Sequence, residues 1–232
     1  MKIPLSARLQ SCCDFVRPGD RVADIGCDHG YLGIYLLTKG IASSVIASDV
    51  NECPLQSAKR NGEKFGVGDK MSFHLSDGVQ SIPRDFDTMV CAGMGGDTMV
   101  SILSAAPWLR DKRYRLILQC QSKTHLVRQY MLDMGWVIEN EVVIRDGRFL
   151  YTVISASWQD IYSNGPFVDY YYSPCLLESP TPESIEYYHR LVKRLRISVN
   201  AQGENADIEE ETVLSQLEAL AKHYPFLQEE AQ

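Results

Sequence analysis

The segment Val22-Ala-Asp-Ile-Gly-Cys-Asp-His-Gly-Tyr-Leu32 constrains the fold of this chain more than any other stretch. An apolar run stops at Gly26, two polar residues follow, and an amphipathic pattern begins near Tyr31, which predicts a strand, a tight turn and a helix start. Glycines let the backbone bend sharply and approach a ligand, and a helix start offers free N–H groups. With Asp24 at the strand end, the turn predicts a site for a nucleotide-like cofactor. A tight turn without a ligand is the alternative, because such turns recur in open α/β sheets.

Length and composition are typical of one well-buried α/β domain with a small appendage. The 232 residues are 45% hydrophobic and 23% charged, which indicates neither disorder nor a fibre. The first residues lack the apolar core of a signal peptide and no run is long enough to cross a bilayer, so we expect a cytoplasmic protein. The seven cysteines form no C-x-x-C pair and the five histidines are scattered, so we expect reduced thiols and no metal.

The net charge of −7 is mostly a property of the C-terminal part. Residues 178–232 carry five Lys or Arg against eleven Asp or Glu, whereas the remaining 177 residues carry 18 against 19. A near-neutral main domain leaves room for a local basic face, so a nucleic-acid partner is not excluded. Basic residues cluster at 110–115 and at 190–196. The first cluster precedes a strand, at the end of the sheet away from the cofactor, and acids at 209–211 neutralise part of the second.

Two further strands end in carboxylates. A strand over residues 45–49 closes on Asp49, and an ionised acid at the tip of a second strand can accept hydrogen bonds from both ribose hydroxyls. We therefore expect Asp49 to bind a ribose, with an ordinary turn aspartate as the alternative. A third strand over residues 71–76 ends at Asp77-Gly78, where a carboxylate is placed to reach an adenine amino group.

The fourth strand, residues 86–93, runs directly into Gly93-Met-Gly-Gly96, and a helix is expected to follow over residues 98–109. Three glycines in four positions strip the strand tip of side chains. A flexible turn is one explanation, and a substrate or methyl donor lying against the backbone is the other. We favour the second, because this tip adjoins the first strand in the usual strand order.

The end of the sheet indicates the fold class. After a fifth strand at residues 114–120 and a helix at 124–134, two β-rich runs, 136–145 and 148–158, flank Asp146-Gly147, a strong hairpin signal. A nicotinamide-binding domain would continue with a sixth parallel strand. Five strand–helix units ending in an antiparallel hairpin match instead the class I (Rossmann-like) methyltransferase sheet of an α/β protein, which we place at residues 1–160.

The last part of the chain predicts a pair of helices. After a linker over residues 161–181, residues 182–232 show two heptad-like patterns separated by a polar turn that contains Gly203. The apolar positions are Ile185, Tyr188, Val192, Leu195 and Val199, then Val213, Leu217, Leu220 and Tyr224. They predict a C-terminal antiparallel two-helix coiled-coil hairpin, which is too short to stand alone and leans on the main domain or a partner. We expect it to dock the substrate.

Five motifs in order carry a family resemblance: Leu5-Ser-Ala-Arg-Leu9, Asp24-Ile-Gly-Cys-Asp-His-Gly-Tyr-Leu32, Asn51-Glu-Cys-Pro54, Asp77-Gly78 and Gly93-Met-Gly-Gly96. With them the chain resembles the bacterial TrmK family of tRNA (adenine(22)-N(1))-methyltransferases over nearly its whole length. The resemblance implies S-adenosyl-L-methionine as methyl donor and tRNA as substrate, modified at N1 of an adenine in the D-arm region. One position differs, since the family usually shows Gln-Pro after the fifth strand and this chain has Gln119-Cys120.

The resemblance also implies site residues. The expected cofactor-binding residues are Asp24, Gly26, Cys27, Asp28, His29, Asp49, Val50, Asn51, Asp77, Gly78, Gly93 and Met94. The expected catalytic residues are Asp28, His29 and Tyr31. Neutral adenine N1 has a free lone pair, so the reaction needs placement more than proton removal. A carboxylate such as Asp28 would stabilise the cationic product, unless Asp28 only caps the turn.

Two other functions remain open on the sequence alone. A class I methyltransferase with a small-molecule or protein substrate would use the glycine-lined fourth strand equally well. A non-catalytic module that binds S-adenosyl-L-methionine or RNA is suggested only by the altered Gln119-Cys120 loop. The sequence does not decide the oligomeric state, for which we favour a monomer.

Overall fold

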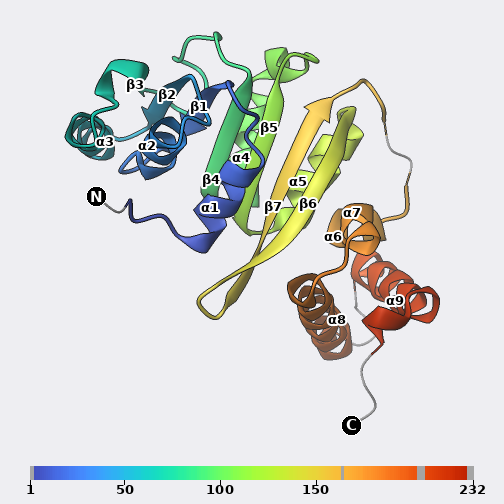
Figure 1. Cartoon of the computed structure of the whole chain (residues 1–232). Helices are drawn as coiled ribbons and strands as arrows, with labels where there is room; N and C mark the ends of the chain where they lie inside the picture. The colour runs from blue at the N-terminus through green and yellow to red at the C-terminus, as the bar shows by residue number, and fades with distance from the viewer. Residues whose placement is uncertain (1–2, 163–164, 203–206, 229–232) are drawn as a thin grey trace.

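The computed structural model describes residues 3–162, 165–202 and 207–228 and contains a seven-stranded sheet in the order β3-β2-β1-β4-β5-β7-β6 (Figure 1). The strands are β1 (Arg21–Ile25), β2 (Ser44–Asp49), β3 (Met71–Leu75), β4 (Thr88–Gly95), β5 (Arg115–Ser122), β6 (Trp136–Asp146) and β7 (Phe149–Trp158). Strands β1 to β5 are parallel, and β7 pairs antiparallel with β5 and with β6. This topology confirms the expected methyltransferase sheet with its terminal hairpin.

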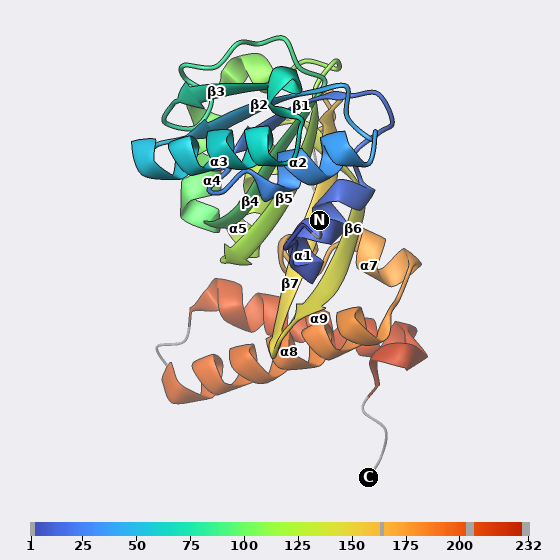
Figure 2. The same cartoon turned by 60° about the vertical axis from the view of Figure 1, so that its left-hand side comes forward.

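Helices cover both faces of the parallel part of the sheet (Figure 2). One face carries α1 (Ala7–Asp14), α2 (Tyr31–Thr38) and α3 (Glu52–Lys64), and the other carries α4 (Gly96–Ser104) and α5 (Thr124–Asp133). Side chains alternate between the two cores, so that Val22 belongs to the α1–α3 side and its neighbour Ala23 to the α4–α5 side. Strands buried on both faces explain why the sequence shows continuous apolar runs there.

Two boundaries on the α4 side differ from the sequence expectation. The helix expected over residues 98–109 ends at Ser104, and a short 3-10 turn, η2 (Pro107–Leu109), follows, because proline cannot continue a helix. Strand β4 does not stop at Gly93. Met94 and Gly95 still pair with β5 after an irregularity in register, so the glycines lie inside the strand end rather than in a free loop.

The C-terminal part packs as a third layer on the hairpin. Residues 161–181, expected as a linker, contain α6 (Val168–Tyr171) and α7 (Pro174–Glu178), which contact α5 and β6. Such short helices leave no helical period in the sequence. They lead into α8 (Pro182–Gln202) and α9 (Ile208–His223). Residues 203–206 of the expected turn, Gly203 among them, lie outside the described residues.

Helices α8 and α9 run antiparallel, as the heptad patterns predict. The Tyr188 hydroxyl donates to the Leu217 carbonyl at 2.8 Å, and the Ser198 hydroxyl lies 2.7 Å from a Glu210 carboxylate oxygen. The seam between them is apolar and buried. It contains Tyr188, Leu191, Val192, Leu195, Val213 and Leu217.

A buried ion pair fastens this layer to the sheet. The side chains of Arg128 on α5 and Glu141 on β6 are both fully buried, with 2.6 Å between Nη2 and Oε1. Arg128 Nη1 also donates to the carbonyls of Tyr170 and Tyr171 on α6, at 2.8 and 3.0 Å. Removing one partner would leave a buried charge uncompensated, which typically costs about 3–5 kcal/mol.

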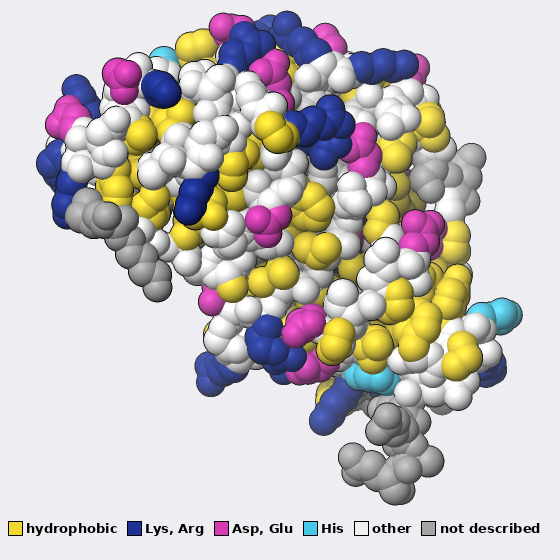
Figure 3. All heavy atoms as spheres, viewed as in Figure 1, with side chains coloured by type: hydrophobic (Ala, Val, Ile, Leu, Met, Phe, Trp, Pro, Cys, Tyr) yellow, Lys and Arg dark blue, Asp and Glu magenta, His cyan; other side chains and the backbone are white. Residues whose placement is uncertain are grey.

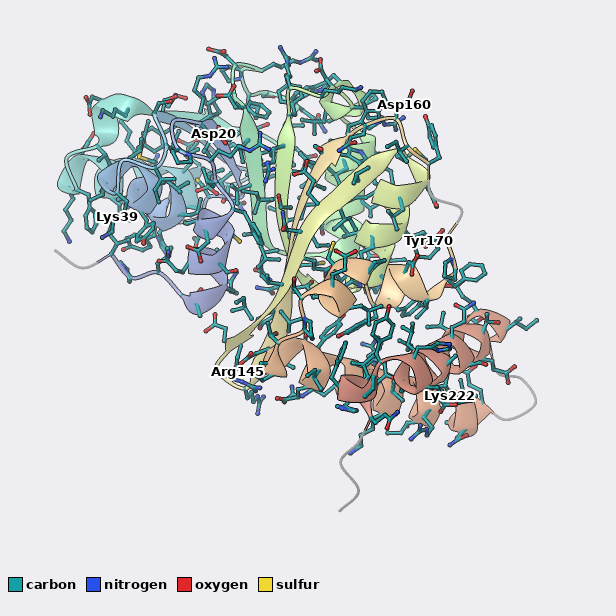
Figure 4. All side chains as sticks on the ribbon, turned by 45° about the vertical axis from the view of Figure 1, so that its right-hand side comes forward. Asp20, Lys39, Arg145, Asp160, Tyr170 and Lys222 are labelled. Carbon is teal, nitrogen blue, oxygen red and sulfur yellow. The ribbon has the colours of Figure 1, made fainter. Side chains whose placement is uncertain are left out.

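The two ends of the sheet have different surroundings. Figure 4 places Asp20, just before β1, and Asp160, just after β7, at the same end. Arg145, near the hairpin tip, lies at the opposite end beside α8. Since Cys120 pairs with Thr152 near the start of β7, the carboxyl ends of the parallel strands lie at this second end, together with the C-terminal helices.

Candidate functional site

The first glycine turn closes tightly between β1 and α2. Gly26 has φ +71°, and the N–H groups of Gly26 and Cys27 both donate to the Ser48 carbonyl, at 2.9 and 2.8 Å. Gly30 also has φ +71°, but a Cβ there would lie 2.9 Å from Ala58 Cβ. Gly30 therefore lets α2 approach α3, and of these two glycines it is Gly26 that borders a cleft.

Asp24 lies at the floor of this cleft with an unsatisfied oxygen. The residue is 4% exposed, and its carboxylate accepts a hydrogen bond from the Gly33 backbone. Its Oδ2 has no hydrogen-bond partner in the described part of the chain. Burial raises the pKa of this carboxyl from 3.8 to about 7, the Gly33 bond opposes the rise, and the Asp49 charge adds to it. A cationic donor in the cleft would satisfy the free oxygen.

Asp49 links the turns that follow β1 and β2. Its Oδ1 accepts the Asn51 N–H at 2.9 Å and its Oδ2 accepts the Asp28 N–H at 3.2 Å. Each carboxylate oxygen keeps further acceptor capacity, which suits a pair of hydroxyls. Ser76 N donates to the Asp49 carbonyl at 2.9 Å, so the next turn, with the exposed Asp77, lies alongside.

Asp28 and its neighbours form the open side of the cleft. Asp28 adopts a left-handed conformation with φ +48°, which is uncommon outside glycine but tolerated by Asp and Asn. Its side chain is 71% exposed, and its Oδ1 lies 3.7 Å from His29 Nε2. The rings of His29 and Tyr31 have centroids 5.9 Å apart. These three side chains are thus close together and accessible.

The second glycine segment meets the first. A Cβ on Gly26 would lie 2.2 Å from Met94 Cε, so the Met94 side chain crosses directly over Gly26. The Met94 sulfur is 3.5 Å from Cys91 Sγ. The tips of β1 and β4, which pair in the sheet, therefore border a common space.

Arg8, on the N-terminal helix α1, also lines this cleft. Gln119 Oε1 accepts hydrogen bonds from Arg8 Nη1 at 2.7 Å and from the Gly93 N–H at 3.1 Å. Arg8 Nε is also 3.7 Å from Asp146 Oδ2. Arg8 and Gln119 are not predictable as partners, because 111 positions separate them. The only sequence signal is that Arg8 lies within the Leu5-Ser-Ala-Arg-Leu9 motif.

The expected site residues thus form one continuous edge at the carboxyl ends of four neighbouring strands. The cleft itself is lined by Arg8, Leu9, Asp24, Gly26, Cys27, Asp28, His29, Tyr31, Leu32 and Ala92. Beside it lie Asp49 at the end of β2, then Val50, Asn51, Asp77 and Gly78 after β2 and β3, and Gly93 and Met94 in β4. Val50 is 64% exposed, which leaves an apolar side chain next to the Asp49 carboxylate.

The chemistry of the cleft suits a zwitterion attached to a ribose. The free oxygen of Asp24 accepts from a cation, and the Arg8 guanidinium in the same cleft can donate to a carboxylate. Asp49 lies next to it with acceptors for a diol. A ligand with an ammonium, a carboxylate and a ribose would match all three.

Other kinds of site are not seen in the described residues. Residues 3–162, 165–202 and 207–228 contain no group of three or more His, Cys, Asp or Glu that could hold a metal ion. None of the helices in these ranges is long and apolar enough to span a membrane. All seven cysteines are free thiols.

The two basic clusters differ in position. Figure 3 shows Lys and Arg side chains gathered mainly along the upper edge, at the amino ends of the parallel strands. The cluster at 110–115 precedes β5 and so belongs to that end, away from the cleft, as expected. On α8, Arg190 pairs with Glu186 and Arg196 with Glu218. Glu186 and Glu218 thus neutralise part of the charge of this cluster.

Comparison with known proteins gives consistent matches. A family model described as "Methyltransferase domain" matches residues 5–154. The tRNA (adenine(22)-N(1))-methyltransferase of Bacillus subtilis (strain 168) is 32% identical over 160 residues, which is 68% of this chain and 67% of that protein.

Two solved structures match nearly the whole chain. The crystal structure of the B. subtilis m1A22 tRNA methyltransferase TrmK has a TM-score of 0.81 at 25% identity, covering 98% of this chain and 100% of that one. A Streptococcus pneumoniae protein, described as a candidate tRNA (m1A22) methyltransferase in complex with S-adenosyl-L-methionine, has a TM-score of 0.80 at 25% identity. That match covers 95% of this chain and 98% of the other.

Proposed function

The chain belongs to the TrmK family of tRNA (adenine(22)-N(1))-methyltransferases, and on this premise we propose that it methylates N1 of the adenine at position 22 of tRNA with S-adenosyl-L-methionine. The observation that carries the proposal is the contact between the two glycine segments, with Met94 lying over Gly26. One cleft then borders both a cofactor and a base.

The residues in the cleft fit the cofactor. S-adenosyl-L-methionine, when bound, supplies an electrophilic methyl group on a positively charged sulfur. Asp24 would accept a hydrogen bond from its ammonium through the unsatisfied Oδ2, and Arg8 would pair with its carboxylate. Asp49 would accept from the ribose hydroxyls. Asp28, His29 and Cys27 would border the turn that surrounds it.

The turns after β2 and β3 would hold the adenine of the cofactor. Val50 offers an exposed apolar side chain for the ring face, while Asp77 would accept from the exocyclic amine. Asn51 keeps Asp49 in place through its N–H. Gly78, with φ +53°, gives this turn its shape.

Methyl transfer requires alignment of the target base with the methyl carbon. The lone pair of adenine N1 forms the new N–C bond while the C–S bond breaks and its electron pair stays on sulfur, so the base becomes cationic. Gly93 and Met94 would border the reacting atoms. The Asp28 carboxylate would stabilise the developing positive charge, and His29 and Tyr31 would contact the base.

The C-terminal layer would dock the tRNA. We divide the chain into a methyltransferase domain at 1–160, a connecting segment at 161–181 and a docking hairpin at 182–232. The support is position, because Arg145, which pairs with Glu186 on α8, lies at the end of the sheet (Figure 4) where the parallel strands have their carboxyl ends and the cleft lies. We also propose that the protein is a monomer in the cytoplasm. A cytoplasmic location is consistent with a tRNA substrate and with seven free thiols, and light scattering after gel filtration tests whether the protein is a monomer.

Incubation with labelled S-adenosyl-L-methionine and unmodified tRNA transcripts tests the proposed function. We expect label in tRNA with adenine at position 22 and none in the matched transcript with guanine there. Label only in proteins or small molecules would favour the other methyltransferase functions. Donor binding without any methylated product would indicate a non-catalytic module.

A further inference from the structure

A second cavity lies between the end of β5 and the C-terminal helices, outside the cleft described above. Its volume is about 140 Å³. It is bordered by the β5–α5 junction, by the start of β7 and by α8. The side chains that matter here are Lys123, His125, Arg128, Tyr171, Tyr187 and Arg194.

The cavity carries one positive charge without a partner. Arg128 is neutralised by Glu141, and the Lys123 ammonium lies 2.9 Å from Asp97 Oδ2. Arg194 makes no ion pair with any residue that the structure describes. Its neighbours on α8, Arg190 and Arg196, are both paired with glutamates. Among the described residues, Arg194 is therefore the cation of the cavity lining whose charge no ion pair offsets, and Glu209, whose carboxylate lies 3.3 Å from the Tyr171 hydroxyl, is a further acid beside the lining.

The pKa of His125 is affected by the charges around the cavity. Its ring is stacked on Tyr171 with centroids 4.8 Å apart and an interplanar angle of 7°. Burial lowers the pKa of His125, and Arg194, Arg128 and Lys123 lower it further. Asp97 opposes them. The neutral imidazole adds a hydrogen-bond donor without an additional charge.

The cavity adjoins the glycine segment that is proposed to receive the target base. Gly95 in β4 pairs with Ser122 in β5, and a Cβ on Gly96 would lie 2.3 Å from the Lys123 carbonyl oxygen. Two residues of the cavity lining, Ser122 and Lys123, thus lie directly beside the glycine segment. A nucleotide whose base lay against that segment would carry phosphates on both sides of its sugar, and this cavity, lined by Arg194, could receive one of them.

We propose that this cavity is a subsite for one backbone phosphate of the RNA substrate, bound by Arg194 with Lys123 and His125 as flanking donors. The proposal rests on the proposed function, because tRNA supplies the phosphate. Guanidinium groups bind phosphate oxygens in a bidentate way. The Lys123–Asp97 pair is more than half exposed on both sides, so it is weak enough to rearrange around an anion.

Substitution of Arg194 tests the subsite, with Lys222→Gln as the matched control. Lys222 is an exposed cation on α9 that does not line the cavity (Figure 4). For Arg194→Gln we expect the slope of log binding constant against log salt concentration for tRNA to fall in magnitude by about 0.7–0.9, the range for one lost phosphate contact in single-stranded and duplex nucleic acid. KM for tRNA should rise about tenfold with kcat and donor affinity unchanged. Arg194→Lys should restore part of the loss, and thermal melting checks that each variant is folded.

Transcripts with single methylphosphonates along the D-arm locate the phosphate. One neutralised position should weaken binding to the unchanged protein as much as Arg194→Gln does, and should cause no further loss in that variant. Equal effects of Arg194→Gln and Lys222→Gln, or additive losses at every position, would overturn the subsite. If the unchanged protein binds tRNA with this phosphate dependence but methylates nothing, the proposed function fails and the subsite stands.

Discussion

Asp24 makes cofactor binding depend on pH in a way that can be calculated. The pKa of this carboxyl is about 7 in the protein without ligand, and an ammonium beside Oδ2 favours the ionised form. At pH 6 only about one-tenth of Asp24 is ionised, so affinity for S-adenosyl-L-methionine should be about tenfold below its plateau. At pH 7 the loss should be about twofold. Binding in this range must release a proton.

The raised pKa of Asp24 also affects folding stability, which falls as pH rises, whereas cofactor affinity increases. The pKa of Asp24 is higher in the folded chain than its ordinary value of 3.8. Its contribution to stability is therefore fully present below pH 3.8 and is lost as pH rises through about 7. The rise of the Asp24 pKa from 3.8 to about 7 corresponds to about 4 kcal/mol of folding free energy, as an order of magnitude. Bound cofactor should offset part of this loss.

Isothermal titration calorimetry between about pH 6 and 7.5 tests this dependence of binding on pH. The range stops at about 7.5 because an α-amino group such as that of the cofactor ordinarily titrates near 7.7–8.0. Two buffers with different ionisation enthalpies measure the released proton. We expect the unchanged protein to show the tenfold pH effect, and Asp24→Asn to bind weakly at every pH without proton release. A dissociation constant independent of pH in the unchanged protein, or full affinity in Asp24→Asn, would refute the reasoning.

Three other substitutions follow from the same geometry. Asp28→Asn keeps a residue that tolerates the left-handed backbone and removes only the charge, so single-turnover rates should fall about 10²-fold or more while donor affinity changes little; equal losses in both would assign Asp28 to donor binding. Arg8→Gln should weaken donor binding measured by calorimetry about 10- to 150-fold, as expected for one charged hydrogen bond of roughly 1.5–3 kcal/mol, and unchanged affinity would remove Arg8 from the site. Arg128→Ala should cost about 3–5 kcal/mol and lower the melting temperature by about 6–20 °C. A shift below about 2 °C by differential scanning calorimetry would show that the buried pair with Glu141 contributes little.

The parts of the fold that could be predicted are those with local signals. The turn after β1 is predicted by a run of consecutive residues, and the Asp146-Gly147 hairpin lies between two β-rich runs. The heptad spacing of α8 and α9 fixes a buried seam that the structure contains. Each of these patterns depends on neighbours within a few positions, so tertiary packing does not override it.

The parts that could not be predicted depend on contacts between distant residues. Gln119 joins Arg8 to Gly93 across three elements, and no local period encodes such a contact. The extension of β4 to Gly95 depends on pairing with β5, although glycine itself disfavours strands. The free Oδ2 of Asp24 is visible only once burial is known. The sequence therefore predicts which segments approach one another at this edge of the sheet, and the structure adds the Arg8–Gln119 contact and the unpartnered oxygen of Asp24.

A crystal structure of the protein with S-adenosyl-L-homocysteine and a tRNA D-arm fragment tests the central claim most directly. We expect the cofactor amine at Asp24, its sulfur between Gly26 and Met94, and the target adenine with N1 directed at that sulfur along the Gly93–Gly96 segment. A cofactor bound away from Asp24, or a base held on the other side of the β4 tip, would contradict the account.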